Sequence, residues 1–156
     1  MVEETVLKNN RVNLSLTNRQ DSNLKRLAIS INMKPSSLAV SLLDRGMYDK
    51  KMIKELEQER HIYSTQMIVS KGGGNKKINR VNLSLTDKQF MNLKRLSIKL
   101  NIRHTKLAAL IIEKCLSNVQ LINDLQNEYC TQKAYRIVPI NKNGELTFTL
   151  IGRDDL

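Results

Sequence analysis

Eight residues occur twice in this chain, as NRVNLSLT at Asn10–Thr17 and again at Asn79–Thr86. Apolar and polar side chains alternate in both copies, which is typical of a β-strand with one buried and one solvent-exposed face. A strand of this kind needs a partner strand and a cover, so we expect the two copies to pair in a two-stranded ribbon. Arginine, asparagine and serine are suited to reading the edges of DNA bases. The polar face of the expected ribbon carries these residue types at Arg11, Asn13, Ser15, Arg80, Asn82 and Ser84.

The repeat extends well beyond the strands. With a spacing of 69 residues, 18 of the 38 positions in 10–47 and 79–116 are identical without a gap, which indicates an internal duplication. Both copies contain the signals for two helices after the strand. These signals are a capping box of threonine and glutamine, an asparagine suited to a left-handed helix end, and the start of a second apolar stripe. They lie at Thr17–Gln20, Asn32 and Pro35 in the first copy, and at Thr86–Gln89, Asn101 and His104 in the second.

Weaker similarity continues after the second helix of each copy. Asp49 and Asn118 are good N-cap residues and predict a third short helix in each half. The alternating stretch Tyr63–Val69 then predicts a strand, and a glycine-rich, basic stretch predicts a flexible linker between the halves. Near the end of the chain, two alternating stretches at 135–140 and 145–151 flank an Asn-Gly pair, which is a strong signal for a β-hairpin.

These patterns predict an α+β chain that is mostly helical. The expected parts are a flexible N-terminus at 1–9, a first strand-helix-helix unit at 10–47, a helix and strand extension at 48–70, a flexible linker at 71–78, a second unit at 79–116, and a helix and β-hairpin extension at 117–156.

The composition favours a polyanionic partner. A net charge of +11 and a pI of about 9.8 point first to nucleic acid and second to an acidic membrane surface, although basicity alone is equally typical of a soluble lysine-rich protein. No apolar run approaches the roughly 20 residues of a membrane span, and the first residues lack the apolar segment of a signal peptide. Cys115 and Cys130 are too few for a disulfide framework. We therefore expect a cytoplasmic protein without a membrane partner.

The order of strand, capped helix, asparagine turn and second helix, with the strand read as R-V-N-L-S-L-T, resembles the ribbon-helix-helix superfamily of DNA-binding proteins, which includes the Arc, MetJ and CopG repressors. The resemblance covers 10–47 and 79–116, about half of the chain. It implies that the two units form an intramolecular pseudo-dimer whose antiparallel ribbon enters the major groove of double-stranded DNA. The presence of both units in one chain resembles conjugation proteins of the TraY type.

The resemblance also implies a role for the polar segments. The six ribbon side chains would contact bases, and backbone amides at the start of the second helix of each copy would hold phosphates. Carried over by position, the phosphate sites lie near Ser36 and Ser37 in the first copy and near Thr105 and Lys106 in the second. Pro35 lacks an N–H group, so the first phosphate site must use the amides that follow it.

The sequence lacks the patterns of an enzyme, so we predict no catalytic site, no metal and no cofactor. His61 and His104 do not have the spacing of metal ligands, and Gly72–Gly74 lacks the phosphate-loop pattern. The four tyrosines lack the histidine cluster that a DNA-nicking enzyme needs. The basic pairs Lys25-Arg26 and Lys94-Arg95 are interpreted either as an exposed helix face or as a contact to the DNA backbone.

Three roles share this expected DNA-binding core. The favoured role is a transcriptional repressor of a plasmid or another mobile element. The alternatives are an accessory DNA-binding factor that acts with the relaxase in conjugative transfer, and an architectural or partition protein. Formation of a homo-oligomer on repeated DNA sites, and a protein partner for the C-terminal extension, stay open at this point, as does the operator sequence.

Overall fold

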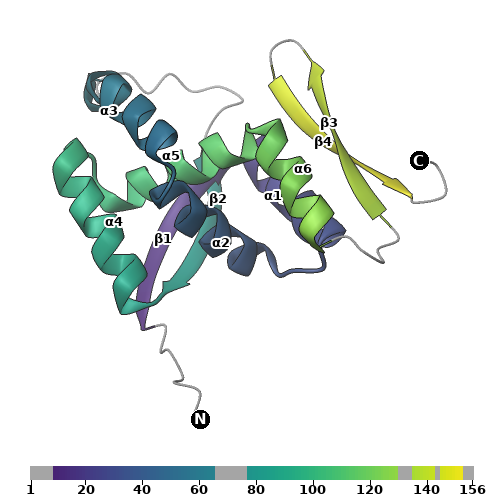
Figure 1. The fold of residues 1–156 in the computed structure, drawn as a ribbon, viewed down its shortest axis with the longest axis horizontal. Helices are drawn as coiled ribbons and strands as arrows, with labels where there is room; N and C mark the ends of the chain where they lie inside the picture. Colours follow the sequence, from purple (N-terminus) through teal and green to yellow (C-terminus); the bar gives the residue numbers. More distant parts are fainter. Residues whose placement is uncertain (1–8, 66–76, 130–134, 143–144, 153–156) are drawn as a thin grey trace.

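The computed structural model of the chain describes residues 9–65, 77–129, 135–142 and 145–152. These residues form an α+β fold that is mostly helical, as predicted (Figure 1). In chain order the elements are β1 (Asn10–Thr17), α1 (Asn18–Ser30), α2 (Pro35–Met47), α3 (Lys50–Thr65), β2 (Lys77–Leu85), α4 (Asp87–Leu100), α5 (His104–Leu116), α6 (Val119–Tyr129), β3 (Tyr135–Lys142) and β4 (Glu145–Gly152).

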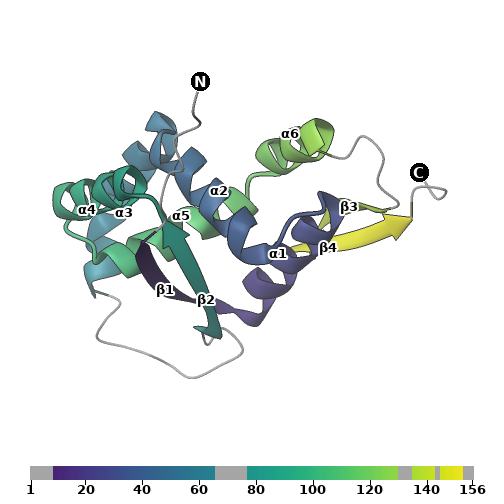
Figure 2. The ribbon, with the colours of Figure 1, turned by 90° about the horizontal axis from the view of Figure 1, so that it is seen from below.

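The two copies of the repeated octapeptide pair with each other. β1 and β2 are antiparallel, and Asn13 lies directly opposite Asn82, so the register is symmetric about this asparagine pair. Figure 2 shows the two strands side by side, with α2 and α5 against them. The expected pairing of the strands is therefore confirmed. Their apolar side chains are buried in the common core, at Val12, Leu14, Leu16, Val81, Leu83 and Leu85.

The first helix of each copy begins and ends as its sequence predicts. The Gln20 amide donates to the Thr17 hydroxyl at 3.2 Å, and the Thr17 amide donates to the Gln20 side chain at 3.0 Å. Thr86 and Gln89 form the same capping box at the start of α4. After these helices the chain turns through left-handed asparagines, with φ of 55° at Asn32 and 54° at Asn101.

Small residues allow α2 and α5 to pack closely. Gly46 and Cys115 occupy the same position of the repeat. A Cβ atom on Gly46 would lie 2.2 Å from Cγ2 of Ile111, so the Ile111 side chain or the helices would have to shift to admit it. The Cys115 thiol in turn donates to the backbone oxygen of Leu42 at 3.4 Å. The two halves therefore share one tightly packed centre, and bulk at either position would separate the helices.

Two symmetric ion pairs show that the halves are interlocked. Arg45 on α2 pairs with Glu128 on α6 at 3.0 Å, and Lys114 on α5 pairs with Glu59 on α3 at 3.2 Å. Arg45 and Lys114 are equivalent residues of the repeat, as are Glu59 and Glu128. Each second helix is thus joined to the third helix of the other half. Exposed pairs of this kind contribute only about 0–1 kcal/mol each, so burial of the core is the main source of stability.

The third helices are present, but the first is longer than predicted. Asp49 and Asn118 accept backbone hydrogen bonds at the starts of α3 and α6, as expected of N-caps. α3 continues to Thr65, so the strand predicted from Tyr63 is wrong for residues 63–65, because 50–65 contains neither glycine nor proline to end the helix. β2 begins at Lys77, which assigns 77–78 to the strand and not to the linker. Residues 66–76 lie outside the described residues.

The predicted C-terminal hairpin is formed by β3 and β4, which pair antiparallel with Lys142 opposite Glu145. Phe148 is fully buried, and Leu146 and Leu150 pack against the core from the same strand. The first strand continues through Pro139, which lies opposite Phe148. The Phe148 amide points away from the hairpin and donates to Asn23, so Pro139 and Phe148 are not a hydrogen-bonded pair of the ladder. The missing N–H of Pro139 therefore costs no hydrogen bond between the strands, and proline is tolerated at such an edge position.

Two buried carboxamides hold the outer edges of this hairpin. The Asn23 side chain on α1 donates to the Leu146 oxygen at 3.0 Å and accepts from the Phe148 amide at 3.0 Å. Gln126 on α6 makes the same pair of bonds to the backbone of Ile137, at 3.1 and 2.7 Å. Each amide side chain thus replaces a neighbouring strand at an edge that would otherwise be open for pairing. The hairpin connects α1 of the first half to α6 of the second.

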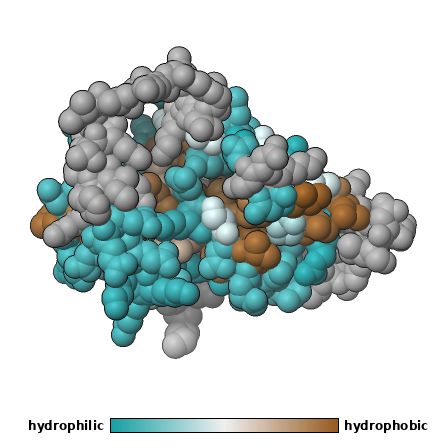
Figure 3. Space-filling model, turned by 90° about the horizontal axis from the view of Figure 1, so that it is seen from above, coloured by the Kyte–Doolittle hydropathy of each residue, from teal (hydrophilic) through white to brown (hydrophobic). Residues whose placement is uncertain are grey.

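The surface is uneven in polarity. Figure 3 shows apolar side chains gathered toward the end of the molecule that carries the hairpin. Val119, Tyr129 and Ile140, on α6 and β3, are large apolar residues that remain exposed. None of the helices described here has both the length and the apolar character needed to cross a membrane.

Candidate nucleic-acid interface

The side of the ribbon that faces away from the core brings together all six residues proposed to read bases. Five of them are exposed and Ser15 is half-buried. The asparagine pair lies in the centre, and an arginine–serine pair lies on each side, Arg11 opposite Ser84 and Arg80 opposite Ser15. The major groove of B-form DNA admits a two-stranded ribbon of this kind. The exposed face therefore carries the same three side chains twice, once on each strand, and the two strands run in opposite directions.

Two further asparagines of the octapeptide fix the ends of the ribbon. The Asn10 side chain donates to the carboxylate of Asp87 at 2.8 Å, and the Asn79 side chain donates to the Asn18 side-chain oxygen at 2.7 Å. Asp87 and Asn18 are the first residues of α4 and α1, so each strand is tied to the first helix of the other copy. Sequence analysis gave these residues no role, although their identical position in both copies was a signal.

The first turns of α2 and α5 differ from those of α1 and α4. Their N-cap residues, Lys34 and Arg103, make no side-chain capping bond. The first amides of a helix have no partner within the helix, and the positive end of the helix dipole favours an anion there. Both helices also pack on the ribbon, α2 on β2 and α5 on β1. The residues predicted to mark the phosphate sites lie in these first turns, with Ser36 and Ser37 exposed and Thr105 and Lys106 half-buried.

At the start of α5, one histidine contacts a lysine and a phenylalanine of α4, an arrangement that the first copy lacks. Nδ1 of His104 lies 3.2 Å from Nζ of Lys94, and the rings of His104 and Phe90 are nearly perpendicular, with centroids 6.0 Å apart. Partial burial and, second, the nearby Lys94 ammonium lower the pKa of His104 from its usual 6.5. The neutral imidazole is therefore favoured at neutral pH. Pro35 occupies the equivalent position in α2, so the two candidate phosphate sites are chemically different.

The basic pairs on α1 and α4 are not equivalent. Lys25 pairs with Asp21 on its own helix at 2.8 Å, and Arg26 donates to the Phe148 oxygen of the hairpin at 2.9 Å. Lys94 faces His104, whereas Arg95 is exposed. Arg26 therefore anchors the C-terminal hairpin, a role that neither interpretation from sequence included.

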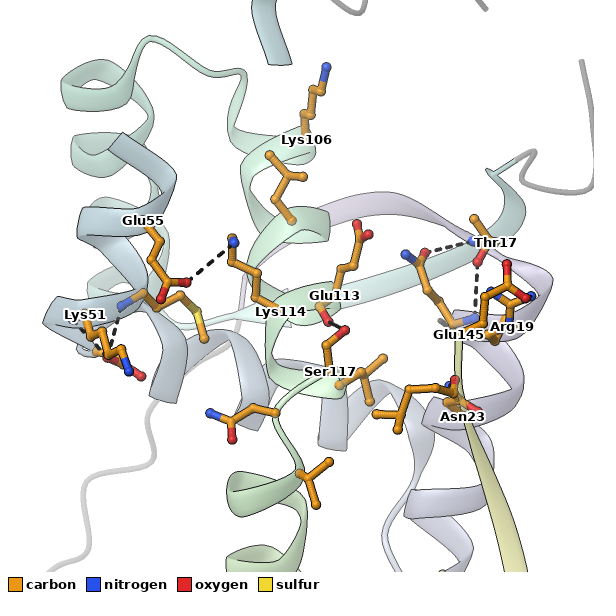
Figure 4. A pocket seen from close by; sticks show the side chains of 18 residues that line it. Thr17, Arg19, Asn23, Lys51, Glu55, Lys106, Glu113, Lys114, Ser117 and Glu145 are labelled. Atoms are coloured by element: carbon orange, nitrogen blue, oxygen red, sulfur yellow. Dashed lines mark hydrogen bonds and ion pairs between the residues drawn. The ribbon is translucent and has the colours of Figure 1, made fainter. Parts of the chain in front are cut away.

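A groove of about 980 Å³ lies near the start of α1, between α3, α5 and β4 (Figure 4). Lys114 points from α5 toward Glu55 at 3.7 Å and Glu59 at 3.2 Å, while Arg19 is paired with Glu145. Charges of both signs are thus paired across the walls of the groove. These ion pairs join neighbouring elements. They leave the groove without an excess of one charge that would attract an ion of opposite sign.

Chemistry that would support a metal or a nucleophile is limited in the described part of the chain. No cluster of three or more histidine, cysteine or acidic side chains there could hold a metal ion. Burial, followed by the charge of Asp49, raises the pKa of the Cys115 thiol to about 12. A thiol with this pKa is almost entirely protonated at neutral pH and is a poor nucleophile, so Cys115 acts as a small packing residue.

Comparison of the chain with protein-family models, with curated proteins and with solved structures found no significant match.

Proposed function

We propose that this chain is a tandem ribbon-helix-helix protein that binds double-stranded DNA in a sequence-specific manner and represses transcription on a plasmid or another mobile element. The observation that supports the proposal is the symmetric pairing of β1 with β2, with apolar side chains buried and polar side chains exposed. A strand pair needed only for stability has no requirement for identical arginine, asparagine and serine residues on its exposed face.

The ribbon chemistry defines the kind of site that it would read. Asparagine makes a bidentate contact with adenine and arginine with guanine. Because the two strands run in opposite directions and their register is symmetric about Asn13 and Asn82, the centre of the site should be nearly palindromic. The residues before the two copies of the octapeptide differ, Leu7-Lys8-Asn9 in one case and Lys76-Lys77-Ile78 in the other, so contacts to the flanking backbone should orient the protein on its site.

Phosphate contacts would supply most of the affinity. The uncapped first turns of α2 and α5 and the net charge of +11 favour a polyanion, and phosphate contacts position a protein without reading sequence. The two unlike first turns would hold the two DNA backbones differently.

Selection of bound duplexes from a random pool tests the proposal. It predicts enrichment of one short site with a nearly palindromic centre, and recovery of unselected sequences only would refute sequence-specific reading. The genomic position of the site then tests the repressor role. A site in the promoter of its own gene agrees with repression, whereas a site beside a nick sequence would favour the conjugation factor instead.

A further inference from the structure

The first helices of the two halves are equivalent in sequence, but only one of them carries a strand pair in the described structure. The β3–β4 hairpin packs on α1, at the end of the molecule opposite to α4 in Figure 1. No described strand pair covers α4 in the same way. Equivalent faces of these two helices are thus found with and without a strand pair in the described part of the chain.

The contacts between α1 and β4 show which features of a strand these helix residues bind. Asn23, only 4% exposed, bonds to both a backbone oxygen and a backbone amide of β4. Arg26 donates to the Phe148 oxygen, and Arg19 pairs with the Glu145 carboxylate. A carboxamide can donate and accept at once, so it binds an extended backbone. Arg19 selects an acidic residue at one end of the strand, and Arg26 binds a further backbone oxygen. The target is a strand edge with an acidic residue and a buried aromatic three positions later.

The same stripe is repeated on α4. At the spacing of 69 residues, Arg19, Asn23 and Arg26 become Lys88, Asn92 and Arg95. The α4 residues lie at i, i+4 and i+7 and therefore share one helix face. Lys88 and Arg95 are exposed and Asn92 is half-buried, so all three are more accessible than their α1 equivalents. The amide of Asn92 donates to the Tyr48 hydroxyl at 2.7 Å, and the Tyr48 side chain is itself 59% exposed.

An apolar residue on α4 completes the surface. Met91 is 51% exposed and lies on the face of Lys88, Asn92 and Arg95, at i+3. Ile98 is also exposed, but its equivalent on α1, Ile29, is 55% exposed with the hairpin in place, so this position lies outside the strand contact. Met91 replaces Ser22 of α1, and Lys99 replaces the buried Ser30, so the α4 surface is more apolar at one position and more basic at another. An exposed apolar side chain between cations suits an acidic polypeptide that also carries large apolar side chains.

We infer that the Lys88–Arg95 face of α4 is a docking site for an extended, acidic–aromatic strand of a partner protein. The carboxamide of Asn92 binds the strand backbone, Lys88 binds its acidic residue, Arg95 binds a backbone oxygen, and Met91 contacts its apolar side chains. A second copy of this chain is a poorer occupant, because its own β4 is held on α1 by the contacts of Asn23, Arg26 and Arg19. The inference does not depend on DNA binding.

The full-length protein can be tested with a labelled peptide of the β4 sequence, ELTFTLI, residues 145–151. Fluorescence anisotropy should show saturable binding. Asn92→Leu, which removes the carboxamide, should weaken the affinity about tenfold, since two hydrogen bonds to the peptide backbone are lost. Arg95→Ala, at an exposed position where folding is not at risk, should also weaken it. Gln58→Ala, on the exposed side of α3, should leave the affinity unchanged, as should the double variant Asn13→Ala, Asn82→Ala.

A photo-reactive phenylalanine in the peptide, at the position of Phe148, identifies the helix that is bound. Crosslinks to α4 are expected. Crosslinks to α1 would mean that the peptide displaces the hairpin of the protein itself, and this result would overturn the inference, as would the absence of saturable binding. Self-association that is removed by Asn92→Leu would overturn the choice of a partner protein, because the occupant would then be a second copy.

Discussion

Asn13 and Asn82 lie opposite each other at the centre of the ribbon, and both are exposed. Because neither side chain has a packing role, Asn13→Ala and Asn82→Ala should leave the fold intact. Each should weaken binding to the selected duplex by about 1–3 kcal/mol, the usual value of a bidentate base contact. Competition titrations with specific and random duplexes measure the effect, with Gln58→Ala as the unaffected control. An equal loss on random DNA would show that these residues do not read bases.

His104 makes the stability of the protein depend on pH. Its pKa is lowered in the folded protein from the usual 6.5. As the pH falls below 6.5, His104 is therefore protonated in the unfolded chain before it is protonated in the folded protein. The free energy of unfolding should therefore decrease as the pH falls through 6.5 toward the lowered pKa. Above pH 7 His104 is neutral in both states, so it should add no pH dependence to the free energy of unfolding. Urea unfolding of the wild type and of His104→Gln across this interval measures the difference. A difference that is constant with pH would contradict the assigned shift.

At the scale of secondary-structure elements, the close crossing of α2 and α5 makes Gly46 sensitive to substitution. In Gly46→Ala the new methyl group would meet Ile111, a branched and buried side chain, at 2.2 Å. Overpacking of a core costs about 1–3 kcal/mol, and the helix propensity of alanine offsets about 1 kcal/mol of this cost. Denaturant unfolding should show a net loss of stability, whereas Lys54→Ala, at an exposed position of α3, should have little effect. A gain in stability would mean that the helices can separate freely.

The elements themselves were predictable where a local signal decides the structure. The alternation of β1 and β2, the capping boxes at Thr17 and Thr86 and the Asn-Gly hairpin signal each depend on residues close together in sequence. The strand predicted from Tyr63 failed because a short stretch that alternates in polarity is also compatible with a helix that has nothing to end it.

At the scale of the whole molecule, the contacts between distant residues could not be read from the sequence. Asn23 and Phe148 are 125 positions apart, and no periodicity connects an exposed-looking helix asparagine to a hairpin edge. The six ribbon residues could be identified because the repeat placed them on two equal strands. The links of Asn10 to Asp87 and of Asn79 to Asn18 became visible only with the strands paired. The inference that α4 binds a strand likewise depends on the packing of the hairpin against α1, which the sequence alone does not show.

The central claim is that a ribbon formed within one chain reads duplex DNA, and a titration of the selected duplex with the protein at 50 and 200 mM salt tests it most directly. If the ribbon and the first turns of α2 and α5 neutralise roughly six to ten phosphates, the affinity should fall about 10³–10⁵-fold between these concentrations. The stoichiometry should be one chain for each palindromic centre. Affinity that is nearly independent of salt, or a requirement for two chains at each centre, would contradict the account.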